Sequence, residues 1–205
     1  MTKKSCYDIT TFGEILIDFT WQGVNEEGQA VFAQNPGGAP ANVAVAAAKL
    51  GARTAFLGKA GKDMHGEFLK EVLKKENVET DGMLLDEKFF TTLAFVKTAE
   101  NGERSFSFAR KPGADTRIEK EEIHTVILDQ TKIFHAGSLS LTDQPARDTT
   151  FYMVYEAQRK VILDLAQKEP CVIVGRNADY ILKDREDIIN QYVRFVDEEP
   201  DKRKN

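Results

Sequence analysis

The sequence is poor in cysteine, in long apolar runs and in excess positive charge, and each absence excludes a class of protein. Only Cys6 and Cys171 occur among 205 residues, so neither a disulfide scaffold nor a cysteine-rich metal site is expected. No run approaches the roughly 18 apolar residues of a membrane span, and no membrane association is predicted. Acidic residues outnumber basic ones by 33 to 28, which argues against nucleic-acid binding through phosphates.

The first residues do not indicate an exported protein. Two lysines stand near the start, but Asp8, Glu14 and Asp18 interrupt the segment that follows them. A secretory signal needs an unbroken apolar region, so none is predicted. Together with the two separated cysteines, this favours a cytoplasmic location.

The residues that are present predict a layered α/β fold. Hydrophobic residues make up 41% and charged residues 30%, which is enough to bury a core, and strand-like runs alternate with helix-like ones. The predicted strands are Tyr7–Phe12 continued after a kink at Gly13 by Ile15–Asp18, then Ala30–Gln34, Thr54–Gly58, Thr91–Lys97, Ser105–Ala109, Lys132–Ala136, Cys171–Gly175 and Tyr192–Val196. The predicted helices are Pro40–Leu50, a helix capped by Asp63, Ala146–Lys168 and a short one near Asp184–Asn190.

The long predicted helix, Ala146–Lys168, has apolar residues at helical spacing. We expect these residues to form its buried face: Phe151, Val154, Tyr155, Ile162, Leu165 and Ala166.

The segment Asn35–Ala48 is the first candidate for a binding site. Gly37 and Gly38 lie where an extended segment enters a helix, so that a ligand can closely approach the backbone N–H groups. Asn42 lies in the first helical turn, where its amide can both donate and accept hydrogen bonds. A tight strand–helix turn packed by small residues explains the same pattern without a ligand.

Asp18 ends an apolar strand and is the second candidate. A carboxylate at the end of a buried strand can point into a cleft at the sheet edge and accept hydrogen bonds from two hydroxyls of a polyol. Capping of a neighbouring helix is the alternative. Arg110 follows a predicted strand and can bind an anionic group, or it is a surface arginine. His65, His124 and His135 are far apart in sequence, and no metal site is predicted.

The motifs together resemble those of the ribokinase-like (PfkB-type) carbohydrate kinases, and of fructokinases most closely. The resemblance covers about residues 7–160. The motifs that carry it are GEILID at 13–18, NPGGAPANVA at 35–44, GKAGKDMHG at 58–66, ERSFSFARKPGAD at 103–115 and IFHAGSLSL at 133–141.

The resemblance implies a layered sheet with helices on both faces and a small β lid built from about residues 23–34 and 91–109. It implies a transferase that phosphorylates a sugar hydroxyl with ATP and Mg²⁺, and a homodimer formed through the lid. The substrate contacts that it implies are Asp18, Gly37, Gly38 and Asn42, with Arg110 and Ser138 near the substrate.

The sequence also departs from the family pattern. The family's later Asp-Pro-Asn-x-Arg, Asn-x-x-Glu and Gly-Ala-Gly-Asp motifs, the last of which supplies the general-base aspartate and lies beside ATP, do not occur. The C-terminal ATP-binding half is therefore expected to be missing, no catalytic residue is assigned, and the chain is expected to be inactive as a kinase. A non-catalytic sugar-binding or interaction domain is the alternative.

Residues 161–205 resemble a different family, the cytidylate-kinase-like proteins. Gly175 and Arg176 stand where that family faces a nucleoside monophosphate, so Arg176 is a candidate nucleotide-binding residue. The expected organisation is a sugar-kinase part, 1–160, followed by an appended helix and strand segment, 161–205. A nucleoside-monophosphate-binding fragment is a further alternative function.

Overall fold

The computed structural model describes residues 6–99 and 102–189. The chain divides into two compact units, Met1–Ala157 and Gln158–Asn205, which are described separately. The strands are β1 (Tyr7–Phe12), β2 (Leu16–Val24), β3 (Ala30–Gly37), β4 (Thr54–Gly61), β5 (Val78–Glu79), β6 (Met83–Asp86), β7 (Leu93–Thr98), β8 (Arg104–Ala109) and β9 (Thr131–Ala136). The helices are α1 (Ala39–Lys49), α2 (Met64–Lys75), α3 (Ala146–Lys168) and α4 (Ala178–Ile181), with 3₁₀ turns η1 (Ala114–Arg117), η2 (Lys120–Glu122), η3 (Thr125–Gln130) and η4 (Leu139–Leu141).

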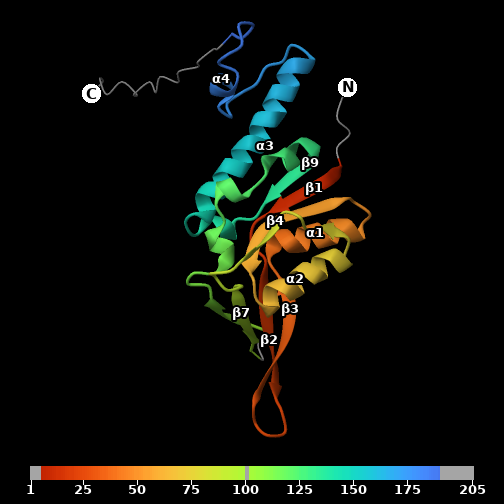
Figure 1. Ribbon diagram of the computed structural model, residues 1–205, viewed down its shortest axis with the longest axis vertical. Coiled ribbons are helices and arrows are strands. Elements are labelled where there is room, and N and C mark those ends of the chain that lie inside the picture. The colour runs from red at the N-terminus through yellow and green to blue at the C-terminus, as the bar shows by residue number, and fades with distance from the viewer. Residues whose placement is uncertain (1–5, 100–101, 190–205) are drawn as a thin grey trace, which may run out of the picture. The chain divides into compact units, whose positions relative to one another are not determined.

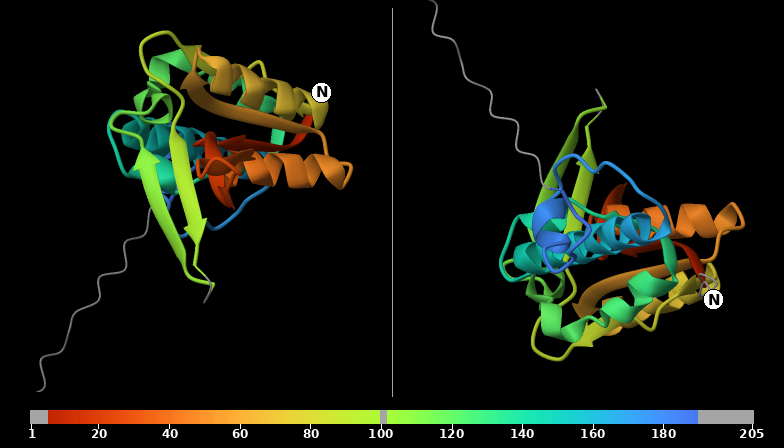
Figure 2. Two further views of the ribbon diagram at one scale, coloured as in Figure 1. Left: turned by 90° about the horizontal axis from the view of Figure 1, so that it is seen from below. Right: turned by 90° about the horizontal axis from the view of Figure 1, so that it is seen from above.

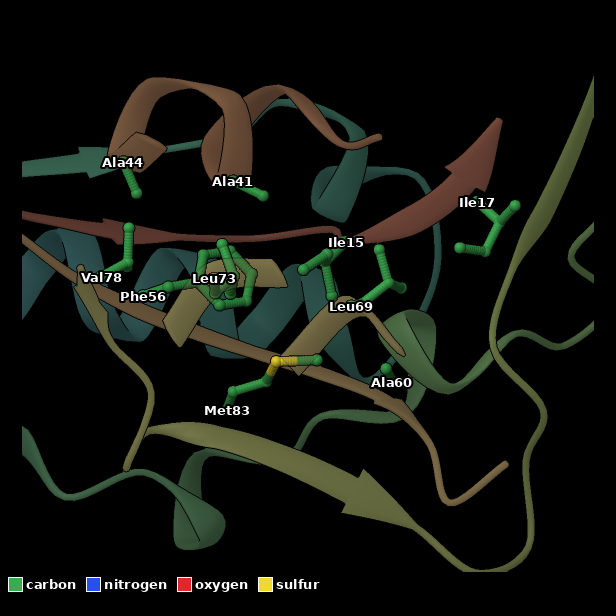
Figure 3. Packing of buried hydrophobic residues seen from close by; sticks show 10 residues of the cluster. All are labelled: Ile15, Ile17, Ala41, Ala44, Phe56, Ala60, Leu69, Leu73, Val78 and Met83. Carbon is green, nitrogen blue, oxygen red and sulfur yellow. The ribbon is translucent and has the colours of Figure 1, made fainter. Parts of the chain in front are cut away.

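A parallel sheet forms the centre of the first unit (Figure 1). Its strand order is β5-β4-β1-β9, and β6 also pairs with β4. The core residues on the side of α1 and α2 are Ile15, Ile17, Ala41, Ala44, Phe56, Ala60, Leu69, Leu73, Val78 and Met83 (Figure 3). A second cluster contains Phe12, Leu57, Ile118, Leu128, Ala146 and Met153, which brings the start of α3 to the other face. The predicted α/β layering, with helices on both faces, is confirmed.

A second, four-stranded sheet extends from this core (Figures 1 and 2). Its order is β3-β2-β7-β8, with antiparallel pairs at both ends and a parallel β2–β7 pair between them. Its first hairpin runs from Leu16 to Gly37, which is longer than the predicted lid segment 23–34. The second hairpin, β7 and β8, has strands close to the predicted ones, and residues 100–101 between them lie outside the described residues.

The prediction of one kinked strand over Tyr7–Asp18 is wrong. β1 ends at Phe12 in the central sheet, and β2 begins at Leu16 in the second sheet. Gly13, at φ 144°, lies between them. A glycine in this conformation allows the chain to leave one sheet and enter another.

Helix α3 has the predicted bounds, but its predicted buried face is confirmed only in part: Ile162 is 4% exposed, as expected. Phe151 is 59% exposed and Val154 is 42% exposed, whereas Met153 is fully buried. Thr149 and Thr150 are also buried, and their hydroxyls are satisfied by donating to the main-chain oxygens of Ile118 and Ala146. Residues 146, 149, 150 and 153 therefore form the packed side of this part of the helix.

The second unit is smaller and differs from its prediction. Its apolar cluster consists of Ile162, Ala178 and Leu182. No strand forms over the described residues 171–174, and Val172 and Val174 are 93% and 87% exposed. A strand without a neighbouring strand leaves its backbone N–H and C=O groups unpaired. An apolar run such as 171–174 therefore does not form a strand by its composition alone.

The short helix of this unit is α4. The helix predicted near Asp184–Asn190 does not form over residues 184–189, the part of that range that the structure describes. The predicted strand at Tyr192–Val196 lies outside the described residues. Among the helices of the described residues, none has the length and apolarity that crossing a bilayer requires.

Candidate functional site

Asp18 and Gly37 lie against each other across the β2–β3 ladder. Leu16 pairs with Gly37, and Asp18 pairs with Asn35. A Cβ at position 37 would collide with the Asp18 carboxylate and would lie 2.9 Å from Leu16 Cδ1, so glycine is required for this approach. Within the described residues no hydrogen bond reaches the Asp18 carboxylate, and partial burial raises its pKa. The carboxylate is thus a half-buried acceptor with capacity for donors from a ligand.

Gly38 forms the entry to α1 in a conformation that favours glycine. It is the N-cap residue at φ 109°, and a Cβ there would lie 2.5 Å from the main-chain oxygen of Glu14. No side chain of the helix itself caps this terminus. Glu14 does so from outside the helix, because its Oε1 accepts from Ala39 N at 3.1 Å.

Glu14 is a buried carboxyl group beside the predicted site residues. It is 4% exposed, and its Oε2 has no hydrogen-bond partner within the described residues. Burial raises the pKa of Glu14, and hydrogen bonds from the backbone N–H groups of Glu14 and Ala39 oppose that rise. A Cβ at Gly137 would lie 2.8 Å from Oε2, which places Glu14 between the start of α1 and the residue before Ser138.

Asn42 is exposed and lies on a different side of the Gly37–Gly38 turn from Asp18. With Gly37 it lines a cavity of about 140 Å³ between α1 and α2, and Asp18 is not among the lining residues. The floor of this cavity includes Ile15 and Leu69. The structure therefore brings Gly37 next to both side chains, Asp18 through the ladder and Asn42 through the cavity.

Arg110 is enclosed by protein acceptors. Its Nε lies 2.9 Å from Asp115 Oδ2, and its side chain is 10% exposed. One terminal nitrogen contacts Thr142 Oγ1 at 2.9 Å and Asp143 Oδ2 at 3.4 Å. The other contacts Asp115 Oδ2 at 2.8 Å and the Leu139 main-chain oxygen at 3.3 Å. All three nitrogens of the guanidinium are thus within reach of protein oxygens. Arg110 therefore differs from both alternatives considered from sequence, a surface arginine and an open site for an anion.

The two remaining candidates are exposed. Ser138 precedes η4, and its main-chain oxygen accepts from Leu141 N at 3.1 Å. Arg176 belongs to the second unit, has φ 63°, and its main-chain oxygen accepts from Gln158 Nε2 at 2.6 Å. The nucleotide role of Arg176 stays a prediction.

Sequence reasoning assigned no role to Glu14 or Asp115, although both lie within the quoted motifs. Both are nearly completely buried, at 4% and 3% exposure. Glu14 could have been found from the sequence because it is a charged residue next to an apolar segment that begins at Ile15. A charged residue in such a place is seldom buried without a partner, so it indicates a specific contact. The partners themselves come from distant segments and are not visible in the sequence.

The described residues do not offer a ligand set for a divalent cation. Within residues 6–99 and 102–189, no group of three or more histidine, cysteine, aspartate or glutamate side chains could hold a metal ion. We therefore derive no step through Mg²⁺ from these residues.

Comparison with known proteins identifies relatives of the chain. A sequence model described as pfkB family carbohydrate kinase matches residues 7–169. The probable fructokinase-6, chloroplastic, of Arabidopsis thaliana is 45% identical over 148 residues, which are 71% of this chain and 38% of the relative. The resemblance of residues 161–205 to cytidylate-kinase-like proteins finds no support in these matches.

Solved structures agree with this match. A fructokinase with bound ATP from Xylella fastidiosa has a TM-score of 0.69 at 42% identity, covering 74% of this chain and 49% of that one. A fructokinase from Vibrio cholerae O395 in a fructose, ADP and calcium ion bound form has a TM-score of 0.66 at 34% identity, covering 77% and 49%. The chain therefore spans less than half of the length of each of these relatives.

Proposed function

The chain belongs to the pfkB family of carbohydrate kinases, and on this premise we propose that its first unit holds the sugar-binding part of a fructokinase-like enzyme. For the whole enzyme of this kind the proposed substrate is fructose and the proposed phosphoryl donor is ATP with Mg²⁺, and the proposed location is the cytoplasm. Fructose, ADP and ATP are bound by the similar fructokinases described above, which supports the choice of substrate and donor.

The Asp18 carboxylate carries this proposal. It is half-buried, lies against the Gly37 backbone and has no hydrogen-bond donor among the described side chains and backbone groups. An unpaired buried carboxylate costs free energy that hydroxyl donors of a ligand can offset. A polyol supplies two neighbouring hydroxyls, which match the two oxygens of a carboxylate.

Phosphoryl transfer itself needs groups that we do not assign in this chain. The family's Gly-Ala-Gly-Asp segment does not occur in these 205 residues, and more than half of each relative's length has no counterpart here. Positioning a substrate without stabilising the transition state gives binding and no turnover. We therefore expect these 205 residues to bind fructose without forming its phosphate.

Calorimetric titration of the chain with fructose tests the proposal. Asp18→Asn should weaken binding about tenfold or more, because it removes charge-assisted hydrogen bonds. Asp81→Asn, an exposed aspartate between β5 and β6, is the matched control and should leave the affinity unchanged. Because burial raises the pKa of Asp18, binding should be complete well above that pKa and should weaken as pH falls through it.

Two outcomes would contradict this proposal in different ways. Absence of saturable fructose binding in the unmodified chain would refute the sugar site. ATP-dependent conversion of fructose to its phosphate by the purified chain would refute the expected lack of turnover, and would exclude a purely sugar-binding role.

A further inference from the structure

One buried carboxylate joins both ends of the β7–β8 hairpin. Thr92 directly precedes β7, Arg110 directly follows β8, and Leu93 pairs with Ala109 at the base of the hairpin. Asp115 Oδ1 accepts from Thr92 Oγ1, and Asp115 Oδ2 accepts from Arg110 Nε. Asp115 therefore closes the open end of the hairpin. We call Thr92, Arg110 and Asp115 the base clamp.

The base clamp is tightly packed and largely shielded from solvent. Asp115 is 3% exposed, and Thr92 is 1% exposed. A Cβ at Gly113 would collide with Thr92 Oγ1 and lie 2.8 Å from Asp115 Oδ1, so the chain passes these atoms where only glycine fits. A hydrogen-bonded ion pair in such surroundings is strongly coupled, and removing one partner leaves the other charge buried.

The base clamp also reaches the turn that contains Ser138. The Arg110 guanidinium donates to the Leu139 main-chain oxygen at 3.3 Å and to Thr142 Oγ1 at 2.9 Å. Leu139 directly follows Ser138, and Gly137, which packs against Glu14 Oε2, directly precedes it. The angle of the hairpin is thus tied to the same turn that borders the candidate sugar site.

Apart from its ladder with β7, little else holds the β8 strand in place. All six residues of β8 are exposed, and β8 is an edge strand of its sheet. The hairpin joins the rest of its sheet through the β2–β7 pairing at Leu93–Val96. An exposed hairpin is only marginally stable by itself, so the contacts at its base add to that pairing in fixing its position. Figure 2 shows the two yellow-green strands extending away from the helices.

The hairpin shares a face with Asp18. In the ladder Asp18 stands opposite Ala94, and Ala94 stands opposite Phe108. Thr20 likewise stands opposite Val96, and Val96 opposite Phe106. Directly opposed residues point to the same side of a sheet, so the two phenylalanines lie on the side of the sheet that carries the Asp18 carboxylate.

We propose that Asp115 is a positioning residue, which through Thr92 and Arg110 sets the β7–β8 hairpin over the sugar held at Asp18. Arg110 then acts within the protein and does not contact the substrate. The effect on sugar affinity rests on the proposed function, whereas the effect on the hairpin does not.

Hydrogen exchange of the full chain, measured by mass spectrometry without ligand, tests the clamp itself. Asp115→Asn should speed exchange of the β7 and β8 amides about tenfold or more, with β1 and β4 unchanged. Thr92→Val keeps the side-chain volume and the ion pair, and should cause a smaller change confined to the same strands. Asp81→Asn, outside the clamp, should change neither.

The outcomes separate the possible failures. Equal acceleration in both sheets would show a general loss of stability and overturn the proposal, and so would unchanged exchange in Thr92→Val. Fructose titration follows, with an expected loss of about tenfold in affinity for Asp115→Asn. If the unmodified chain binds no fructose, the proposed function fails while the exchange data still judge the clamp. If Asp115→Asn loosens the hairpin yet binds fructose as tightly as the unmodified chain, the positioning role is refuted.

Discussion

Lys59 is a charged side chain inside the fold whose hydrogen bonds are supplied by three different segments. It is 4% exposed in β4 and donates to Asp86, to Glu122 at 2.5 Å and to the Arg117 main-chain oxygen at 2.9 Å. A buried ammonium group is tolerated only when its donors are satisfied. Lys59 therefore joins β4, β6 and the η1–η2 segment, which also contains Asp115.

Replacing Lys59 should cost far more stability than replacing an exposed neighbour. Lys59→Met should lower the free energy of unfolding by about 3 kcal/mol, since it leaves carboxylates without their cation. Lys62→Met is the matched control: Lys62 pairs with Glu87 at 2.8 Å on the surface, and its loss should leave the free energy of unfolding almost unchanged. Urea unfolding followed by circular dichroism measures both. Equal costs would contradict a structural role for the buried network.

The Asp63 carboxylate caps helix α2, as expected from the sequence. It also connects this helix to the segment before β7. Its Oδ1 accepts from His65 N at 3.0 Å and Gly66 N at 2.9 Å, which caps α2. The same carboxylate accepts from Thr91 N and Thr91 Oγ1, both at 2.8 Å. The start of α2 is thereby fixed to the residue that precedes Thr92 of the base clamp.

The pH dependence of this cap has a defined sign. Burial alone would raise the pKa of Asp63, but hydrogen bonds from Thr91, Gly66 and His65 outweigh burial and lower the pKa below its ordinary value of 3.8. An acid with a lowered folded-state pKa stabilises the fold above its unfolded pKa. That stabilisation is lost as pH falls through the folded pKa.

Asp63→Ala should therefore destabilise the protein by about 2 kcal/mol at neutral pH, and by less in acid. Urea unfolding at neutral pH and near pH 3 measures the difference between variant and unmodified chain, with the window set by the ordinary value of 3.8. Asp81→Ala provides the control at an exposed turn. A difference that stays constant between the two pH values would mean that the Asp63 charge contributes nothing.

The elements differ in how far the sequence could predict them. The bounds of α1 and α3 follow from proline, glycine and helical periodicity, which are local signals. The buried face at the start of α3 does not, because Thr149 and Thr150 are buried there with their hydroxyls hydrogen-bonded to Ile118, Ser140 and Ala146. Segment 171–174, predicted as a strand, forms neither a helix nor a strand. A strand needs a neighbouring strand to pair with, and the local sequence pattern does not show whether one is present.

At the scale of the molecule, the family motifs predicted the layers, and tertiary contacts determined the details of the site. Asp18 and Gly37 were both named from sequence, and the β2–β3 register explains why they meet. The enclosure of Arg110 was not predictable, because Leu139, Thr142 and Asp143 lie about thirty residues away in sequence. Such contacts depend on the path of the chain after η1, which composition does not encode.

The second sheet also leaves apolar side chains exposed on the Asp18 side. Phe106 is 56% exposed and Phe108 is 50% exposed, and their rings stack at 6.2 Å. Val31, opposite Gly23, adds a further exposed apolar side chain at 40%. Adjacent exposed aromatic residues on an edge strand favour association, which supports the expectation of a homodimer formed through the lid.

Sedimentation velocity over a range of protein concentrations tests this expectation. The unmodified chain should dimerise, and the double variant Phe106→Ser, Phe108→Ser should shift to monomer because the apolar area that drives association is lost. Phe90→Ser is the matched control: Phe90 is 78% exposed but lies outside the second sheet, so its replacement should leave the equilibrium unchanged. If the double variant still dimerises, the dimer contact lies elsewhere. The role that remains for the two phenylalanine rings is then to cover the sugar, because they share a face of the sheet with Asp18.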